Sequence, residues 1–341
     1  MIRVGLTGIG FMGMIHYLAY QNIPGVEVVA FCEKYSKERL EGDWTKIKGN
    51  FGPQGTMMDM SKFAKYTELS DLIADPNVDM IDICLPPNQH AEAAIACLQG
   101  GKHVFCEKPI ALKPEDGARM AAAAAESGKC LNIGHVLPFF PAYQVLIEAK
   151  NSGKWGKLLG GNFTRVISDP KWLPKFFDMD VTGGPMLDLH VHDAHFIRYF
   201  FGMPSAVQGL GRCRGGVPEY FNVQYLYENP EYTVTATSGI IMQQGRPFTF
   251  GFEVHFEKAT VLTECFTGTP LTILHEDGSV ERPELPAGSD TLPFENELTE
   301  ALSCIREGRK SSLLDGTLAA DAVALCYKEI ESIVTKKPVR I

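Results

Sequence analysis

Short apolar runs and amphipathic stretches alternate through the first 135 residues. Runs rich in β-branched and aromatic residues predict strands at 2–7, 27–32, 80–85, 103–106 and 130–133. Amphipathic stretches between these runs predict helices at 11–21, 70–74, 91–99 and 114–127. Because strands that alternate with helices favour a doubly wound parallel sheet, we expect an α/β domain over residues 1–135. The stretch 49–60 has neither pattern and predicts a long loop.

The alternation of predicted strands and helices ends after residue 135. A strand is expected at 158–166, with helices on either side of it at 141–151 and 185–201. Several strand-like runs without intervening helices then follow between residues 206 and 274, including 219–227, 232–241, 248–256 and 260–266. Such a succession is typical of an antiparallel sheet. With helices at 293–307 and 316–335, residues 136–341 predict an α+β domain with a large, mostly antiparallel open sheet. The C-terminal helices are candidates to pack back on the first domain.

Composition excludes several classes of partner. The 341 residues include 41 acidic and 32 basic ones, which gives a formal net charge of −9. This balance argues against a nucleic-acid partner and against a polybasic membrane anchor. The sequence shows no leader-like segment and no apolar run of about 18 residues, so we expect no membrane span and a cytoplasmic protein. The nine cysteines include no Cys-x-x-Cys pair and are interpreted as buried apolar residues in a reducing compartment.

A glycine-rich turn follows the first predicted strand. Gly8, Gly10 and Gly13 fit the pattern G-x-G-x-x-G, with Phe11 and Met12 between them at the start of a predicted helix. In such a turn the glycines let the backbone approach a pyrophosphate, which binds at the helix N-terminus. An ordinary structural turn is the alternative. His16, one turn further along, is interpreted as a packing residue.

An acidic residue ends the next predicted strand. Glu33 lies 20 residues past Gly13, where a carboxylate accepts hydrogen bonds from the adenosine ribose. Its charge repels a 2′-phosphate and therefore favours NAD over NADP. Lys34, Ser36 and Lys37 follow directly and could partner such a phosphate, so NADP stays possible.

A lysine follows the strand predicted at 103–106. Lys108 lies where the carboxyl ends of parallel strands meet ligands, and Pro109 after it disfavours helical geometry at the lysine. A solvated loop lysine is the alternative reading of this position.

The predicted helix 185–201 carries a cluster of histidines. Asp188 and His192 are four residues apart and therefore share one face, with His195 three residues further on. A histidine can take the hydroxyl proton when hydride leaves a carbinol carbon, a carboxylate can orient it, and a lysine ammonium can stabilise the developing alkoxide. His190 and His192 lie about 200° apart around a helix, which disfavours a shared metal ion, so we expect no metal. Purely structural polar residues are the other alternative.

Four motifs occur in an order that points to one family. They are Gly8–Gly13, Leu85-Pro86-Pro87-Asn88-Gln89-His90, Cys106-Glu107-Lys108-Pro109 and the run 183–192, Gly-Gly-Pro-Met-Leu-Asp-Leu-His-Val-His. With these motifs the chain resembles the glucose–fructose oxidoreductase/inositol dehydrogenase (Gfo/Idh/MocA) family over essentially its whole length. The stretch 49–60 is longer than usual for that family, and His195 stands where members often have a second acid.

The resemblance implies roles for particular residues. Lys108, Asp188 and His192 match the catalytic lysine, aspartate and histidine of the family. A second group matches positions that usually line the cofactor, and it comprises Leu85, Pro86, Asn88, His90 and Glu107. The family's C-terminal sheet holds the sugar and often forms the interface of a homo-oligomer, which suggests a dimer or tetramer.

The sequence therefore predicts an NAD(P)-dependent oxidoreductase. It would move a hydride between nicotinamide and a secondary alcohol or ketone of a sugar, an inositol or a sugar derivative. Arg165 and Trp172, near the end of the strand at 158–166, are candidates to bind that substrate beside Lys108, Asp188 and His192. Two alternatives stay open: an NAD-dependent enzyme that cleaves glycosides through transient sugar oxidation, and a non-catalytic dinucleotide sensor.

Overall fold

The computed structural model describes residues 1–49, 51–171, 173, 175–228, 230–265, 269–286, 288–289 and 291–341. Its chain divides into two compact units, each built from two stretches. The first unit comprises Met1–Phe139 and Gly288–Ala320, and the second comprises Phe140–Ala287 and Asp321–Ile341. Among the described helices, none has the length and apolarity that crossing a membrane requires.

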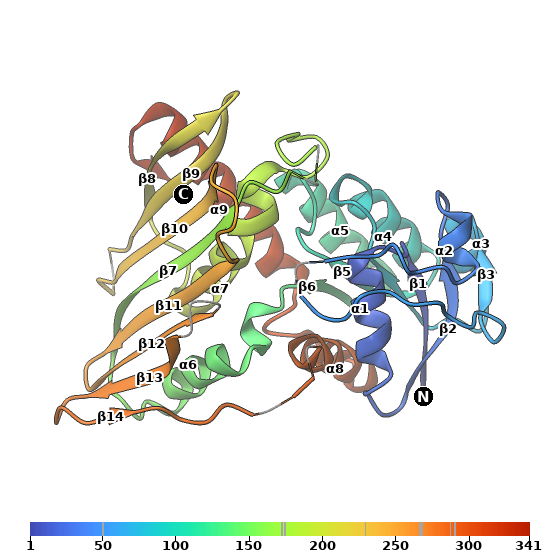
Figure 1. The fold of residues 1–341 in the computed structure, drawn as a ribbon, viewed down its shortest axis with the longest axis horizontal. Coiled ribbons are helices and arrows are strands. Elements are labelled where there is room, and N and C mark those ends of the chain that lie inside the picture. The colour runs from blue at the N-terminus through green and yellow to red at the C-terminus, as the bar shows by residue number, and fades with distance from the viewer. Residues whose placement is uncertain are drawn as a thin grey trace. The chain divides into compact units, whose positions relative to one another are not determined.

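A six-stranded parallel sheet forms the centre of the first unit (Figure 1). Its strands in spatial order are β3 (Ala64–Tyr66), β2 (Val26–Cys32), β1 (Ile2–Thr7), β4 (Met80–Ile83), β5 (His103–Glu107) and β6 (Leu131–Gly134). The strand order reverses between β1 and β4, and ligands of open α/β sheets bind at the carboxyl ends of strands at such a point. The expected parallel sheet is confirmed.

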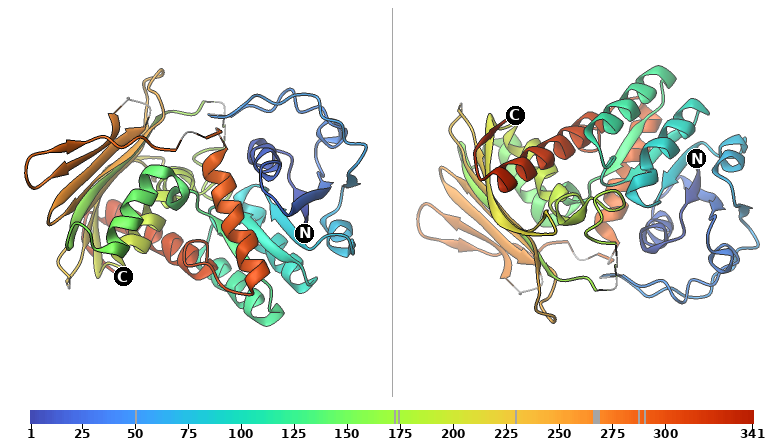
Figure 2. Two further views of the ribbon diagram at one scale, coloured as in Figure 1. Left: turned by 90° about the horizontal axis from the view of Figure 1, so that it is seen from below. Right: turned by 90° about the horizontal axis from the view of Figure 1, so that it is seen from above.

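Helices cover both faces of this sheet. On one face lie α3 (Leu69–Ala74), α4 (His90–Gln99) and α5 (Pro114–Ser127), whereas α1 (Phe11–Tyr20) packs against α8 (Leu292–Glu307) on the other (Figure 2). Strands β1 and β4 are buried almost throughout, as expected for strands covered on both faces. Two short elements were not expected from the sequence, the helix α2 (Lys37–Leu40) and the edge strand β3. The loop expected at 49–60 contains no helix or strand among its described residues.

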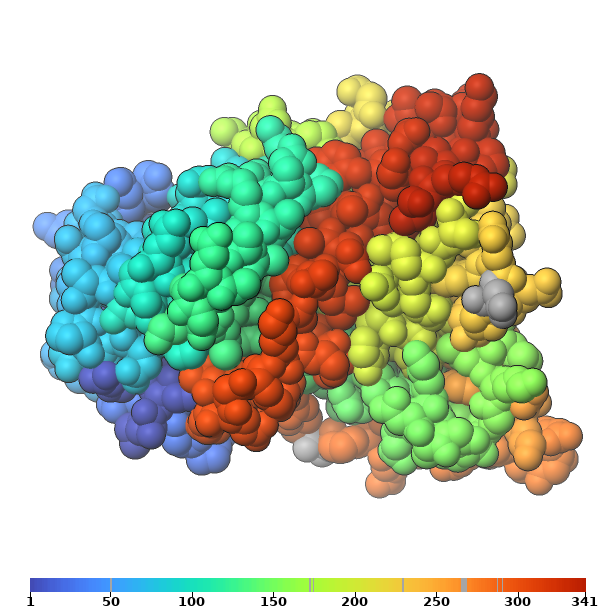
Figure 3. Space-filling model, turned by 180° about the vertical axis from the view of Figure 1, so that it is seen from behind, coloured from blue at the N-terminus to red at the C-terminus, as the bar shows by residue number. Residues whose placement is uncertain are grey.

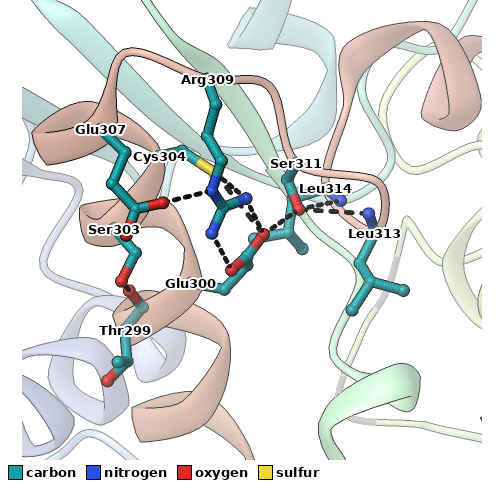
Figure 4. A network of polar contacts seen from close by, with 9 residues as sticks. All are labelled: Thr299, Glu300, Ser303, Cys304, Glu307, Arg309, Ser311, Leu313 and Leu314. Carbon is teal, nitrogen blue, oxygen red and sulfur yellow. Dashed lines mark hydrogen bonds and ion pairs between the residues drawn. The ribbon is translucent and has the colours of Figure 1, made fainter.

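The segment after α8 is held to the sheet of the first unit by a network of polar contacts (Figure 4). Arg309 donates to both carboxylate oxygens of Glu300 at 2.8 Å, and Ser311 Oγ donates to the same carboxylate at 2.7 Å. Ser311 Oγ also accepts from the backbone N–H of Leu314, whose carbonyl accepts from Ile133 of β6 at 2.9 Å. Figure 3 shows the side on which this segment, in orange, adjoins α5, where a cavity of about 340 Å³ lies between them.

A nine-stranded sheet forms the second unit. In spatial order its strands are β14 (Val280–Glu281), β13 (Thr269–His275), β12 (Ala259–Cys265), β11 (Thr249–Phe256), β7 (Leu158–Ser168), β10 (Thr233–Ile241), β9 (Val217–Leu226), β8 (Ala206–Arg214) and β15 (Val339–Arg340). The pair β7–β10 is parallel, and the other described pairs are antiparallel. The expected large, mostly antiparallel sheet is therefore confirmed.

Helices cover one face of this second sheet (Figure 2). They are α6 (Pro141–Ser152), α7 (Val191–Phe201) and the part of α9 (Gly316–Thr335) that follows residue 320. Tyr143 of α6 meets the rings of Phe196 of α7 and Phe252 of β11 edge-on, with centroids 4.8 and 4.9 Å apart. On the opposite face Asn222 donates to Thr237 and Thr235 donates to Asn162 across neighbouring strands, and Leu210 and Tyr220 are exposed beside Asn222.

The helix expected at 185–201 does not have a single geometry. Its first part, Met186–His190, is a π-helical turn in which the N–H of Val191 bonds to the carbonyl of Met186, five residues back. The α-helix α7 begins only at Val191. The prediction of one continuous α-helix was therefore wrong over its first turns, because one extra residue is accommodated in the helix. Single π turns of this kind are frequent at functional sites.

Candidate functional site

Glycine stands at each of the three positions of the first turn for a different structural reason. Gly8 has φ +88°, and a Cβ there would lie 2.6 Å from the carbonyl oxygen of Cys84. At Gly13 a Cβ would lie 2.2 Å from the oxygen of Gly8, so glycine permits the helix to pack on the strand. Gly10 differs, because a Cβ there would meet nothing within 4 Å and its φ of −99° suits any residue.

This open position suits a bound pyrophosphate. Gly10 is the N-cap of α1 and has no side chain to satisfy the N–H groups of the first turn, which starts at Phe11 and Met12. Free N–H groups and the positive end of the helix dipole attract an anion. The space that a Cβ would fill is thus the space through which a phosphate approaches the backbone. The residues present fit a dinucleotide.

Glu33 lies directly beside this turn. Its half-buried carboxylate accepts from the backbone N–H groups of Ile9 at 2.9 Å, of Tyr35 at 2.9 Å and of Ser36 at 3.1 Å. These bonds fix the carboxylate at the end of β2 next to the glycine turn. Arg39 donates to the carbonyl of Ile9 at 3.0 Å, so the guanidinium also borders the turn.

The basic residues after Glu33 have partners of their own. Lys34 forms an ion pair with Glu68 at 2.8 Å, and Ser36 Oγ accepts from the N–H of Arg39 as the N-cap of α2. Lys37 is exposed at the start of α2. Lys34 therefore points to a carboxylate, which makes it a poor partner for an added phosphate.

The turn after β4 and the turn after β5 are joined by His90. Its Nδ1 lies 2.8 Å from the carbonyl oxygen of Pro109 and its Nε2 lies 2.8 Å from that of Leu85. Burial lowers the pKa of His90 and outweighs these carbonyls, which favour the charged ring. Pro86 and Asn88, in contrast, are exposed on the turn. The predicted cofactor contacts of these residues stay predictions.

Lys108 begins the turn at the end of β5, and the Lys108–Pro109 peptide bond is cis. The lysine is half-buried, and its backbone N–H donates to Oε2 of the buried Glu107 at 3.1 Å. The turn thus lies at the carboxyl edge of the parallel sheet, two strands from β1.

A buried polar cluster lies beneath these turns. His16 of α1 has Nδ1 2.9 Å from Asp82 of β4 and Nε2 3.1 Å from Glu107, and all three side chains are buried. Cys84 Sγ is 3.3 Å from the same Nδ1. Within the described part of the chain, His16, Asp82 and Cys84 are the group whose atoms could hold a metal ion. The expectation of no metal stays a prediction.

Asp188 and His192 lie in the second unit on the same helical segment. Every residue from Gly183 to Ile197 is buried except these two, which are half-buried. A segment buried on all other sides thus presents an aspartate and a histidine together. Because they are separated by about one turn of either helix type, the π turn leaves them on one side.

The other polar side chains of this segment serve the core of the second unit. His190 Nδ1 lies 2.8 Å from Ser238 Oγ, and its Nε2 lies 2.8 Å from a carboxylate oxygen of Glu329 on α9. Arg165 is buried and donates to Asp193, so the substrate contact predicted for it stays a prediction. His195 is buried as well. Trp172, the other predicted substrate residue, lies outside the described residues.

Sequence reasoning did not single out Asp82 or Glu297. Glu297 lies on α8 and is fully buried, and no side chain in the described part of the first unit forms a hydrogen bond with it. Burial raises its pKa well above the usual range, and the charge of Glu107 raises it further. The sequence signal that could have identified Glu297 is an acidic residue at a position of the helix that the amphipathic pattern assigns to its apolar face.

Both units match models of known protein families. Residues 2–135 match an oxidoreductase family with an NAD-binding Rossmann fold, and residues 143–262 match the GFO/IDH/MocA C-terminal domain. Together these stretches span most of the chain and contain each of the predicted site residues.

Individual relatives are more distant. A myo-inositol 2-dehydrogenase of Thermotoga maritima is 31% identical over 201 residues, which are 59% of this chain and 55% of that protein. This chain therefore aligns with little more than half of that relative. A scyllo-inositol 2-dehydrogenase (NAD(+)) of Bacillus subtilis strain 168 is 24% identical over 92% of this chain and 89% of that protein.

Solved structures share the fold. Levoglucosan dehydrogenase in complex with NADH and levoglucosan has a TM-score of 0.82 and 21% identity, covering 100% of this chain and 99% of that chain. At this identity the likeness shows the fold alone.

Proposed function

Because the chain belongs to the Gfo/Idh/MocA family of oxidoreductases, we propose that it is an NAD-dependent dehydrogenase or reductase of a sugar, an inositol or a sugar derivative. The observation that carries the proposal is the partial exposure of Asp188 and His192 on an otherwise buried segment. Relatives named as inositol and levoglucosan dehydrogenases support the substrate class. In this proposal residues 1–135 bind the cofactor, with 288–320 completing their unit, and the remaining chain binds the substrate.

The cofactor residues follow from the geometry of the first unit. Gly8, Gly10 and Gly13 with the first turn of α1 would hold the pyrophosphate. Glu33 would accept from the adenosine ribose, and its negative charge together with the pairing of Lys34 to Glu68 favours NAD over NADP. Leu85, Pro86, Asn88, His90 and Glu107 would line or support the remaining contacts. When bound, the nicotinamide supplies the hydride acceptor or donor.

The proton side of the reaction is assigned to three side chains. His192 would take the proton from the substrate hydroxyl, and Asp188, on the same side of the helix, would orient the imidazole or the hydroxyl. The Lys108 ammonium would stabilise the negative charge that develops on the substrate oxygen. In the reductive direction the same groups would return the proton.

We also propose a homo-oligomer, a dimer or a tetramer, that forms through the face of the nine-stranded sheet that α6, α7 and α9 leave open. This face has hydroxyl and amide side chains bonded across strands, as at Asn222 and Thr237, beside the exposed apolar side chains of Leu210 and Tyr220. An interface on such a face would combine hydrogen bonds with apolar contacts. Light scattering of the purified protein tests it, and a monomer at micromolar concentration would contradict it.

A screen with a matched pair of lysine variants tests the function. Polyols, sugars and sugar acids are offered with NAD and with NADP, and nicotinamide absorbance is followed. Lys108→Ala should lower turnover on the order of 10²–10⁴-fold while NAD binding stays within a few-fold, because the ammonium acts on the substrate oxygen. Lys113→Ala is the control, since Lys113 also precedes a proline but is exposed. Near-normal turnover of Lys108→Ala would contradict the assignment.

A further inference from the structure

One cluster of titratable groups in the first unit contains, apart from Glu107, only residues that have no role in the proposed chemistry. It comprises His16 and Tyr20 of α1, Asp82 and Cys84 at β4, Glu107 of β5 and Glu297 of α8, and we call it the His16 cluster. His16, Asp82 and Glu297 are fully buried, and Tyr20 and Glu107 are nearly so. Burying this many ionisable groups is unfavourable unless their charges are paired. The arrangement therefore needs a reason.

The imidazole of His16 lies between two carboxylates. Nδ1 is 2.9 Å from an oxygen of Asp82, and Nε2 is 3.1 Å from Oε1 of Glu107. A neutral imidazole has one N–H and can donate to one carboxylate, whereas the imidazolium can donate to both. Nδ1 has hydrogen-bond geometry to Asp82, whereas Nε2 meets Glu107 at ion-pair distance without hydrogen-bond geometry, so the two carboxylates suit a positively charged ring. It balances one of the two negative charges and bridges β4 and β5.

Glu107 connects His16 to the turn of the predicted catalytic residue Lys108. Oε1 of its carboxylate pairs with His16, while Oε2 accepts from the backbone N–H of Lys108 at 3.1 Å. Gly134 of β6 leaves room for this carboxylate, because a Cβ there would lie 3.2 Å from Oε1. The peptide that begins the Lys108 turn is therefore held by a side chain that His16 holds in turn.

We propose that His16 is a positioning residue that fixes Glu107 and, through it, the turn that presents Lys108 to the substrate. This inference rests on the proposed function of Lys108. Loss of the Nε2 contact would let the Glu107 carboxylate turn away, and the Lys108 peptide would lose its acceptor. A displacement of about 1 Å at a reacting group can lower turnover on the order of 10²-fold.

The surroundings of His16 support a charged ring. Burial alone lowers its pKa, but the charge of Asp82 and the contacts with Asp82 and Cys84 raise it well above the usual value. The other facing groups are consistent with this. The Tyr20 hydroxyl donates to Asp82 at 3.0 Å, and burial, together with the charge of Glu107, raises the pKa of Glu297 and so favours its uncharged form.

Metal binding is the alternative explanation for this arrangement of side chains. His16 Nδ1, Asp82 and Cys84 Sγ could ligate a metal ion, but a thiol ligates as the thiolate and burial raises the pKa of Cys84. The 2.9 Å separation of Nδ1 and the Asp82 oxygen is that of a direct hydrogen bond. We therefore assign His16, through its contact with Glu107, to positioning rather than to metal binding.

Two amide variants separate the contacts of the ring. The amide nitrogen of glutamine can replace Nε2, and that of asparagine can replace Nδ1, so His16→Gln can keep the contact with Glu107 and His16→Asn the contact with Asp82. The expected kcat of His16→Gln is within about tenfold of the wild type, whereas His16→Asn loses on the order of 10²-fold. KM for NAD should change little in both. Tyr20→Phe is the control, because it removes a donor to Asp82 and should lower the melting temperature without changing kcat.

Equal kcat values for the two His16 variants would overturn the inference, because a merely structural role would not distinguish them. A second measurement does not depend on variants that fold or on turnover. In ¹⁵N-histidine NMR of the wild-type protein at pH 8, the His16 ring should keep protons on both nitrogens. A neutral tautomer, or one equivalent of zinc in the purified protein, would contradict it. If the wild type has no dehydrogenase activity but shows this signal, the proposed function fails while the charged bridge stands.

Discussion

Arg165 of β7 and Asp193 of α7 form a buried ion pair with two contacts. Nε of Arg165 lies 2.7 Å from Oδ2 of Asp193, and Nη2 lies 3.2 Å from Oδ1. The guanidinium also faces the ring of Phe250, with 5.1 Å between its carbon and the ring centroid. Because Asp193 directly follows His192, this pair attaches the helix of the predicted proton acceptor to the sheet.

Breaking this pair should destabilise the second unit strongly. Asp193→Asn leaves the Arg165 charge buried beside a neutral amide, so we expect a loss of about 3–5 kcal/mol in the free energy of unfolding. The double variant Arg165→Met, Asp193→Leu removes both charges and should recover most of the loss. Denaturant unfolding measures both effects. A loss below about 1 kcal/mol for Asp193→Asn would contradict the pairing. If Arg165 also binds substrate, the double variant will have a raised KM despite its recovered stability.

Substitutions in the glycine turn should separate folding from binding. At Gly13 a Cβ would lie 2.2 Å from the oxygen of Gly8, so Gly13→Ala should lower the melting temperature by several degrees. A Cβ at Gly10 meets nothing within 4 Å, so Gly10→Ala should fold normally and bind NAD about tenfold or more weakly, because the methyl group occupies the approach of the phosphate. Calorimetric titration and thermal melts check the pair. Unchanged NAD affinity of Gly10→Ala would argue against this binding mode.

The buried acid of α8 should make stability depend on pH. Burial raises the pKa of Glu297 in the folded state, so its favourable contribution is fully present below the usual glutamate pKa and is lost as the pH rises towards the raised value. Glu297→Gln keeps the neutral shape and removes this loss. Relative to the wild type, the variant should gain at most about 1.4 kcal/mol per pH unit between pH 5 and the raised pKa. Melts from pH 5 to 8 measure the difference, and a constant difference would show that Glu297 is ionised.

The network after α8 predicts a local effect. The hydrogen bond of Arg309 lowers the pKa of Glu300, and the paired carboxylate also accepts from Ser311. Glu300→Gln should destabilise the protein by about 1.5–3 kcal/mol, because hydrogen bonds of a charged group are lost. Hydrogen exchange should rise first at the amides of Leu313 and Leu314, which bond to Ser311. Exchange that rises evenly over the chain would contradict a local role for the network.

Much of the fold follows from local sequence patterns. The helices Pro114–Ser127 and Gly316–Thr335 have the predicted bounds, because proline or glycine at one end and amphipathic spacing mark them clearly. Strand β3 was missed because it has three residues, none of them buried, and follows a loop. The π turn at Met186–His190 was missed because residue spacing alone does not reveal one additional residue inside a helix.

The candidate site residues could be identified from sequence motifs, but the buried contacts around them could not. Lys108, Asp188 and His192 were identified from motifs, and their roles stay proposals. The partners of His16 could not be identified, because Asp82 is 66 residues away and the third group, Glu107, further still. Pairing at such distances depends on how the strands are ordered in the sheet, which local patterns do not specify.

The first unit is discontinuous in the chain, and this affects how it can be made. Its α1 face is covered by α8, which the ribosome synthesises only after β7 to β14, eight of the nine strands of the second sheet. The unit that begins the polypeptide is therefore completed late, and until then the buried groups of α1 stay open to water. A fragment that ends at residue 139 would lack this cover, so the cofactor-binding part of the protein should be excised as residues 1–139 joined by a short linker to residues 288–320.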